Sequence, residues 1–382
     1  MHNRSPIHCI VPPHILRNIA TNGTAAQKNL AIDTIKGSAR IRGQRQVLAE
    51  FPTAAFRVAA GGKERVLYDA KNGSSLPGTV VRREGEGPTA DVAVNEAYDG
   101  SGYTYDLYND IYQRNSIDGS GMRLDSTVHY RVGYDNAFWD GEQMVYGDGD
   151  ENLPISERLF NRFTIAVDVM GHELTHGVTQ YEAKLTYSQQ PGALNESMSD
   201  VFGSLVKQYH LQQAATDADW LIGQGLLTEN VKGIALRSMK APGTAYDDPV
   251  LGKDPQPGHM KDYVNILSDN GGVHINSGIP NHAFYITATE LGGNAWERAG
   301  KIWYVTLKDK LTANSNFQNC ADLTYQAAGE LFGAGSIEQQ AVQKGWAEVG
   351  LAVGGTTPPP DTGGGGCLEA LLRLFGAAPA KG

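Results

Sequence analysis

Residues from about 58 to 122 follow a pattern of short runs in which apolar and polar positions alternate, broken by glycine and aspartate. Val66-Leu67-Tyr68 is typical, and Val128-His129-Tyr130 continues the pattern further along the chain. Alternation with a period of two, bounded by turn residues, predicts strands and hairpins. We therefore expect a β-rich lobe that covers residues 58–170.

The periodicity becomes helical near Glu157. Apolar residues at spacings of one to four predict a largely buried helix that begins there; they are Leu159, Phe160, Phe163, Ile165, Val169 and Met170. The same pattern predicts later helices, and these cover residues 194–210, 280–291, 294–308, 320–332 and 337–349. An α+β protein with two lobes follows, in which a mainly helical lobe at 171–352 succeeds the β-rich lobe.

Two terminal segments differ from both lobes. Residues 1–57 join Pro12-Pro13-His14-Ile15-Leu16 to a stretch of helical character and then to a basic segment, and they form one compositional unit. Residues 353–366 hold three prolines and six glycines, which predicts a linker. The apolar residues of the tail at 367–382 fit either a short amphipathic helix at a partner or membrane surface, or a disordered end, and we favour the second.

The composition limits the kind of protein. The chain has 382 residues, of which 41% are hydrophobic and 19% charged, so it can bury two packed lobes and is not a disordered chain. Its net charge of −10 argues against nucleic acid or an anionic membrane as the main partner. The acidic residues are spread along the chain, which is typical of a solvated surface.

The three cysteines, Cys9, Cys320 and Cys367, lie in different regions and do not form the pattern of a disulfide framework. No run approaches the roughly 18 apolar residues that span a bilayer. The first residues contain no apolar core of a signal peptide. We expect export without an ordinary signal peptide, with retention in the cytoplasm as the alternative.

The segment with the clearest chemistry is His172-Glu173-Leu174-Thr175-His176. Residues four apart on a helix lie about 40° apart around its axis, so both imidazoles face one point. Two converging neutral imidazoles are what Zn²⁺ needs from its first two ligands. Glu173 then projects beside the metal, where it can hold the attacking water. Taken alone, these five residues are also compatible with an exposed helix whose glutamate forms a salt bridge.

A second motif supplies the third ligand that catalytic zinc requires. Glu196 lies twenty residues beyond His176, on the next predicted helix, and Asp200 follows one turn later on the same face. Asp200 can accept a hydrogen bond from the second ring nitrogen of a zinc-bound histidine. A glutamate favoured by the helix dipole is the alternative for Glu196, but the combination of the two motifs favours zinc.

These motifs strongly resemble those of the thermolysin family of metallopeptidases, and the similarity covers about residues 60–352. Gly171-His172-Glu173-Leu174-Thr175-His176-Gly177-Val178-Thr179 is similar to the first zinc motif of that family, and Gly192-Ala193-Leu194-Asn195-Glu196-Ser197 with Asp200 is similar to its second. The resemblance implies a thermolysin-like fold with the zinc site on the helix between the lobes. It also implies that His172, His176 and Glu196 are ligands and that Glu173 is the general base.

Three further stretches carry the resemblance and imply roles for their residues. Tyr134-Asp135-Asn136-Ala137-Phe138-Trp139 is similar to the edge strand that holds an extended substrate, through Asn136 and the carbonyl of Ala137. Other matched positions imply an arginine for a substrate carbonyl, two oxyanion donors and a carboxylate behind one of them; these are Arg237, His274, Tyr187 and Asp269. Donors at a developing oxyanion lower the barrier by a few kcal/mol each.

Substrate preference depends on a set of apolar positions. They match the pocket that binds the residue after the cut in the family, and they are Phe160, Phe163, Val169, Ile222 and Leu236. The resemblance therefore implies cleavage on the amino side of bulky apolar residues, with ordinary core packing as the alternative.

The calcium sites of the family look depleted in this chain. Lys207 stands where a bridging glutamate is expected, and Leu221 and Gln224 replace two further acids. An ammonium group opposes a hard cation that needs several oxygen ligands. Asp168 and Asp219 remain, so one weak Ca²⁺ site is compatible with the sequence, and we expect calcium to matter little.

The leader is similar to the short N-terminal segment of the protealysin-like branch of the family. We expect residues 1–57 to be an inhibitory propeptide that the enzyme removes itself, by a cut between Glu50 and Gly61. Cys9 is either a thiolate ligand that blocks the zinc or a free, inert cysteine, and we favour the second.

The expected function is that of a zinc-dependent endopeptidase, made as a secreted, monomeric zymogen, that acts on proteins and peptides. A catalytically silent metal-binding protein of the same fold is one alternative, but only turnover needs Glu173, Tyr187 and His274 together. A zinc aminopeptidase is another, although the extended-substrate segment at Asn136 and Ala137 suits cleavage within a chain.

Overall fold

The computed structural model describes residues 8–50 and 61–354. Residues 51–60, in which most of the expected cleavage region falls, lie outside the described parts, as do the first seven residues. The same holds for most of the predicted linker and for the whole C-terminal tail.

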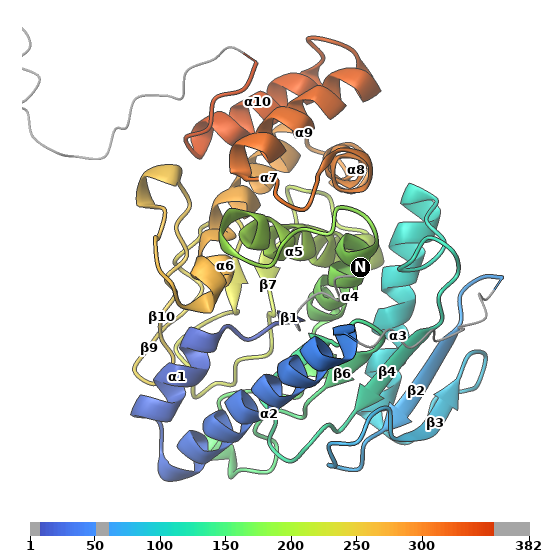
Figure 1. Cartoon of the computed structure of the whole chain (residues 1–382), viewed down its shortest axis with the longest axis vertical. Helices are drawn as coiled ribbons and strands as arrows, with labels where there is room; N and C mark the ends of the chain where they lie inside the picture. Colours follow the sequence, from blue (N-terminus) through green and yellow to red (C-terminus); the bar gives the residue numbers. More distant parts are fainter. Residues whose placement is uncertain (1–7, 51–60, 355–382) are drawn as a thin grey trace, which may run out of the picture.

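A mixed six-stranded sheet forms the first lobe, shown at the lower right of Figure 1. Its strands in spatial order are β1 (His8–Cys9), β5 (Ala137–Trp139), β6 (Met144–Tyr146), β4 (Leu124–Val128), β2 (Arg65–Asp69) and β3 (Thr79–Arg83). β4 runs parallel to β2 and β6, and β5 is antiparallel to β6. The strand predicted at 128–130 ends at Val128, because His129 takes a φ of 55° that leaves the ladder.

One helix contradicts the prediction that residues 58–122 contain only strands and hairpins. α3 (Val92–Asp106) begins at Asp91, whose carboxylate accepts the backbone N–H groups of Ala93 and Val94, and it continues into a π-helical turn, Leu107–Ile111. Two glycines lower the helix propensity of this segment. The packing explains one of them, because a Cβ at Gly100 would lie 2.1 Å from Sδ of Met170.

α4 (Val167–Tyr181) and α5 (Gln189–Leu211) form the centre of the molecule (Figure 1). They pack closely because Gly203 has no side chain; a Cβ there would lie 2.4 Å from the carbonyl oxygen of Asp168. The helix predicted from Glu157 begins only at Val167. Phe160 instead forms a β-bridge with Leu227, and the carboxylate of Asp150 accepts its N–H group.

The second lobe is mainly helical and lies at the top of Figure 1. Its helices are α6 (Asp269–Asn276), α7 (Gly278–Leu291), α8 (Ala299–Val305), α9 (Phe317–Phe332) and α10 (Ile337–Glu348), and a π-helical turn, Thr306–Lys310, extends α8. Two short antiparallel strand pairs lie between α5 and α6 in the sequence, β7 (Leu221–Ile222) with β8 (Arg237–Ser238), and β9 (Asp247–Asp248) with β10 (Gly252–Lys253). The helix predicted at 294–308 starts five residues late, and α5 starts five residues before the predicted 194. The helices predicted at 280–291, 320–332 and 337–349 agree within a few residues.

The leader packs against the catalytic lobes. Its helix α2 (Ala25–Glu50) crosses the molecule in front of the sheet, and α1 (Pro13–Asn22) lies beside β9 and β10 (Figure 1). β1 adds to the edge of the sheet at β5. The backbone N–H of Asp135 donates to Oγ1 of Thr34 at 3.1 Å. In the described part of the chain no helix combines the length and the apolar character needed to cross a membrane.

Candidate metal and catalytic site

Three side chains from the two central helices converge at the centre of the molecule. His172 and His176 on α4 and Glu196 on α5 are each at most 1% exposed, and their ligand atoms lie within 4.8 Å of one another. The Nε2 atoms of the two histidines are 3.0 Å apart, and Glu196 Oε2 has no hydrogen-bond partner among the described residues. Buried polar atoms without a partner cost free energy, and a bound cation would satisfy all three side chains. Two imidazole nitrogens and a carboxylate fit zinc.

Hydrogen bonds fix the orientation of both imidazoles. Nδ1 of His172 lies 2.8 Å from Oδ1 of Asp200, so its Nε2 faces the centre. Nδ1 of His176 lies 2.8 Å from Oδ1 of Asn195 and 3.0 Å from Oγ of Ser199. The sequence analysis did not identify Asn195 and Ser199, although their positions on either side of Glu196, within one turn of α5, were a usable signal.

Asp200 connects His172 to Arg237, the arginine expected to bind a substrate carbonyl. Arg237 donates to both carboxylate oxygens at 2.8 Å, and Asn281 on α7 donates at 2.8 Å. Burial alone would raise the pKa of Asp200, but the charge of Arg237 and the hydrogen bond from His172 outweigh it and hold that pKa far below its usual value. Asp200 is therefore a permanent anion that holds His172 and Arg237 in place.

Glu173 is fully buried beside the three ligands. Its Oε2 accepts the backbone N–H of Trp139 at 2.9 Å, and its Oε1 has no hydrogen-bond partner in the part of the chain that the structure describes. Burial raises the pKa of Glu173 well above its usual value, and the nearby charge of Glu196 adds to this. The contact with β5 holds one oxygen fixed and leaves the other for a reacting proton.

Two donors lie on the opposite side of the ligands. Nδ1 of His274 is 2.6 Å from Oδ1 of Asp269, and Nε2 is 3.2 Å from the hydroxyl of Tyr187, which also donates to Glu196. Burial would lower the pKa of His274, but the carboxylates of Asp269 and Glu196 raise it to about 9. His274 is therefore an imidazolium donor at neutral pH.

A tight turn at the start of α6 brings His274 back onto Asp269. Asn270, Gly271 and Gly272 have φ values of 50°, 88° and 77°. This left-handed conformation favours glycine, and it lets the carboxylate of Asp269 accept both the ring and the backbone N–H of His274.

The leader occupies the positions expected for substrate. β1 runs antiparallel to β5, and the backbone N–H of Ile10 donates to the carbonyl of Ala137 at 3.2 Å. The next residue, Val11, donates its N–H to Oδ1 of Asn136 at 3.0 Å. Asn136 and Ala137 therefore contact an extended peptide in the way that the resemblance implies for substrate.

The carbonyl groups of Cys9 and Ile10 contact the two cationic side chains of the site, His274 and Arg237. The carbonyl oxygen of Cys9 lies 3.2 Å from Nε2 of His274. The carbonyl oxygen of Ile10 accepts Nη1 of Arg237 at 3.1 Å. The structure thus brings the expected oxyanion donor and the expected substrate arginine onto adjacent carbonyls of one peptide.

The thiol of Cys9 does not join the three ligands. It is buried with Ile41, Tyr130, Tyr134 and Phe138 in an apolar cluster, and burial raises its pKa to about 12. A protonated thiol in these surroundings favours the inert cysteine over a thiolate ligand.

The five expected pocket residues are fully or nearly fully buried. They share one large apolar cluster with Ile10, and they are Phe160, Phe163, Val169, Ile222 and Leu236. Both a filled substrate pocket and ordinary core packing agree with this arrangement.

Lys207 occupies the region of the expected calcium site. Its Nζ lies 2.9 Å from carboxylate oxygens of Asp168 and of Asp219, and it donates to the carbonyl of Leu221 at 3.1 Å. The ammonium group therefore neutralises the two acids that remain there. This arrangement opposes a Ca²⁺ ion at this one position, and the wider expectation that calcium matters little stays a prediction.

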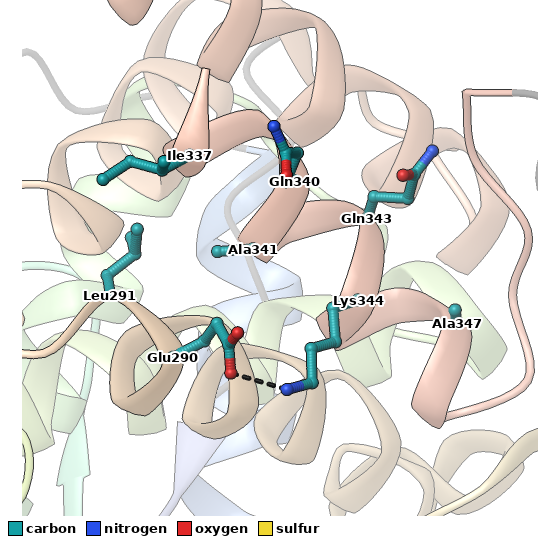
Figure 2. A pocket seen from close by; sticks show the side chains of 8 residues that line it. All are labelled: Glu290, Leu291, Ile337, Gln340, Ala341, Gln343, Lys344 and Ala347. Carbon is teal, nitrogen blue, oxygen red and sulfur yellow. Dashed lines mark hydrogen bonds and ion pairs between the residues drawn. The ribbon is translucent and has the colours of Figure 1, made fainter. Parts of the chain in front are cut away.

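A separate groove of about 590 Å³ lies between α7 and α10 (Figure 2). Glu290 and Lys344 form an ion pair of 2.6 Å across it. Its lining contains none of the candidate catalytic residues.

Comparisons with known proteins show the family of this chain. Residues 36–180 match the model of the thermolysin metallopeptidase catalytic domain, and residues 183–351 match the model of its alpha-helical domain. The chain is 50% identical over 351 residues to an extracellular metalloprotease of Pectobacterium carotovorum subsp. carotovorum, covering 91% of this chain and 97% of that protein. It is 47% identical over 349 residues to protease PrtS of Photorhabdus sp. (strain Az29), covering 90% and 92%.

A solved structure is similar over most of the chain. It is the precursor of protealysin, a metalloproteinase from Serratia proteamaculans, with a TM-score of 0.81 and 51% identity, and the match covers 90% of this chain and all of that chain. These matches confirm the predicted combination of a sheet-containing catalytic domain with a helical domain.

Proposed function

Because this chain belongs to the thermolysin family of metallopeptidases, as its motifs predict, we propose that it is a zinc endopeptidase made as a self-inhibited precursor. We propose further that it cuts internal bonds on the amino side of bulky apolar residues. The observation that carries the proposal is the extended leader at His8–Val11, which crosses the three ligands and contacts the groups expected to bind substrate.

The metal ligands in this proposal are His172, His176 and Glu196, whose facing lone pairs fit one Zn²⁺ ion. When bound, zinc supplies Lewis acidity to water and to the substrate carbonyl. Asp200 holds His172 in one orientation and so maintains the geometry of the ligands.

The chain's own groups handle the proton and the developing charge. Glu173 takes a proton from the attacking water through its unpaired Oε1 and passes it to the leaving nitrogen. His274 and Tyr187 donate to the oxygen that becomes negative, and Asp269 keeps His274 charged and oriented. Asn136, Ala137 and Arg237 hold the substrate backbone in an extended pose.

The leader, residues 1–57, is the inhibitory segment in this proposal, followed by catalytic lobes at 58–170 and 171–352. A tethered segment competes with substrate at a high effective concentration, and this supports a nearly inactive precursor. We place the self-cleavage between Glu50 and Gly61, where Phe56 and Val58 offer bulky apolar residues. Two relatives are named extracellular metalloproteases, which supports export of this chain. We propose that the exported enzyme is a monomer.

A peptide blocked at both ends tests the proposed activity. The peptide contains a single leucine as its bulky apolar residue. The purified chain should cut it internally because the extended-substrate contacts do not require a free terminus, and the cut should fall immediately before that leucine. Mass spectrometry of the products identifies the bond. Cleavage restricted to peptides with a free amino terminus would support the aminopeptidase alternative, and zinc binding without any cleavage would support the silent protein.

The inhibitory contact should weaken in acid because of His14 on α1. Its Nε2 lies 2.8 Å from the hydroxyl of Tyr246, and within residues 8–50 and 61–354 its buried Nδ1 has no hydrogen-bond partner. Burial and the positive charge of His274 lower its pKa to about 4, and Arg237 adds to this while Asp269 opposes it. The bound leader therefore holds His14 neutral. The affinity of the leader for the enzyme should be full above about pH 6.5, which is the pKa of a free histidine. That affinity should fall as the pH drops toward 4.

This prediction is measured with a synthetic leader, residues 1–50, as an inhibitor of the processed enzyme. Its inhibition constant should rise about 10-fold between pH 7 and pH 5. A His14→Gln leader is the matched control, since glutamine keeps a hydrogen-bonding group but does not titrate. Equal pH dependence of the two leaders would contradict the role of His14.

A further inference from the structure

The leader places one particular peptide bond between the catalytic groups. The bond from Cys9 to Ile10 has its carbonyl oxygen 3.2 Å from Nε2 of His274, the expected oxyanion donor. Its nitrogen belongs to the N–H that donates to the carbonyl of Ala137 on β5, and Glu173 is held on the same strand by the N–H of Trp139. The carbonyl oxygen and the leaving nitrogen of this bond therefore both lie among the groups expected to act in catalysis.

The neighbouring residues confirm the register along the site. One residue further on, the carbonyl of Ile10 accepts Arg237 and the N–H of Val11 donates to Asn136. A shift by one residue would break these contacts, because successive backbone groups of a strand point in opposite directions. Ile10 itself has no exposed surface and is the bulky apolar residue that follows the bond.

We propose that the Cys9–Ile10 bond is a second substrate of the enzyme, so that the leader is an inhibitor which the enzyme slowly destroys. This inference rests on the proposed function. The oxygen of water bonds to the carbonyl carbon of Cys9, and the bond to the nitrogen of Ile10 breaks. Glu173 carries a proton from the water to that nitrogen. The products are a leader fragment that ends in the carboxylate of Cys9 and one that begins with the amine of Ile10.

Packing of the leader explains why this cut is slow. α1 begins at Pro13, two residues after Val11, and Ile15 and Ile19 on it are fully buried. On α2, Oγ1 of Thr34 accepts the N–H of Asp135, and the hydroxyl of Ser38 forms a hydrogen bond with that of Tyr134, both in the segment before β5. After cleavage these contacts keep the new amine beside the new carboxylate, so that re-formation of the bond competes with release of the fragments. Loss of β1 pairing then weakens the remaining inhibitor.

The test uses a synthetic acetylated peptide of residues 5–16 and the purified chain, in water enriched with ¹⁸O. Mass spectrometry should find one cut, between Cys9 and Ile10, with the label in the carboxylate of Cys9. An Ile10→Gly peptide, which loses the apolar side chain after the bond, should be cut about 10- to 100-fold more slowly. The leader released from the full chain should also acquire Ile10 as its first residue over time, as shown by N-terminal sequencing.

The blocked leucine peptide separates this inference from the proposed function. If that peptide is cut while the leader peptide stays intact or is cut at another bond, such as the one before Ile15, the inference is wrong and the proposed function stands. If neither peptide is cut, both are wrong. Equal rates for the Ile10→Gly and parent peptides would also overturn the assigned register.

Discussion

Replacement of Glu173 by alanine should abolish peptide cleavage and leave zinc bound. The ligand atoms of His172, His176 and Glu196 are unchanged in this variant, so the metal content should equal that of the wild type. The group that takes the proton from water is gone, and general base catalysis by such a group contributes roughly 10²–10⁴-fold. The expected residual rate is below a few per cent of normal.

The same substitution tests self-processing. The Glu173→Ala chain should keep its full mass of 41.1 kDa, whereas the wild-type chain should lose its leader up to a point between Glu50 and Gly61. Metal analysis, a casein assay and intact mass are the three measurements. Glu229→Ala, at an exposed position, is the matched control and should behave as the wild type. An active wild-type enzyme that still carries residues 1–50 covalently would contradict self-removal of the leader.

Periodicity predicted the fold where local pattern and tertiary packing agree. The helices at 320–332 and 337–349 were found within a few residues, since their apolar faces repeat regularly. α3 was missed because Gly100 and Gly102 weaken the helical pattern, and the need for glycine at Gly100 arises only from contact with Met170 on α4. The early start predicted for α4 failed because apolar residues near Phe160 are buried in loops and a β-bridge.

The site shows the same division between local and distant signals. The spacing within α4 and α5 placed two histidines and a glutamate together, because a helix converts spacing directly into direction. Asn281 contacts Asp200 across 81 positions, and no local pattern signals such a pair. The register of the leader at Ile10 and Val11 depends on docking of α1 and α2, so the sequence could suggest an inhibitory segment but not the bond that it presents.

Replacement of His274 by alanine should lower kcat roughly 10²–10³-fold with little change in KM. Nε2 of His274 contacts a carbonyl oxygen in the bound leader, and its donation strengthens when that oxygen gains charge in the transition state. Asn136, Ala137 and Arg237 still hold the substrate backbone in the variant, which is why KM should change little. His210→Ala is the matched control, since His210 is an exposed residue that stacks on Tyr103.

The pH profile separates this role from a structural one. Asp269 and Glu196 raise the pKa of His274 to about 9 against the opposing effect of burial, so the charged donor is present below that pH and is lost as the pH rises through it. The kcat of the wild type should therefore fall on the alkaline side of about pH 9, and the His274→Ala enzyme should lack that decline. A defect confined to KM would assign His274 to substrate binding. An unchanged alkaline decline in the variant would assign that titration to another group, because the variant has no imidazolium to lose.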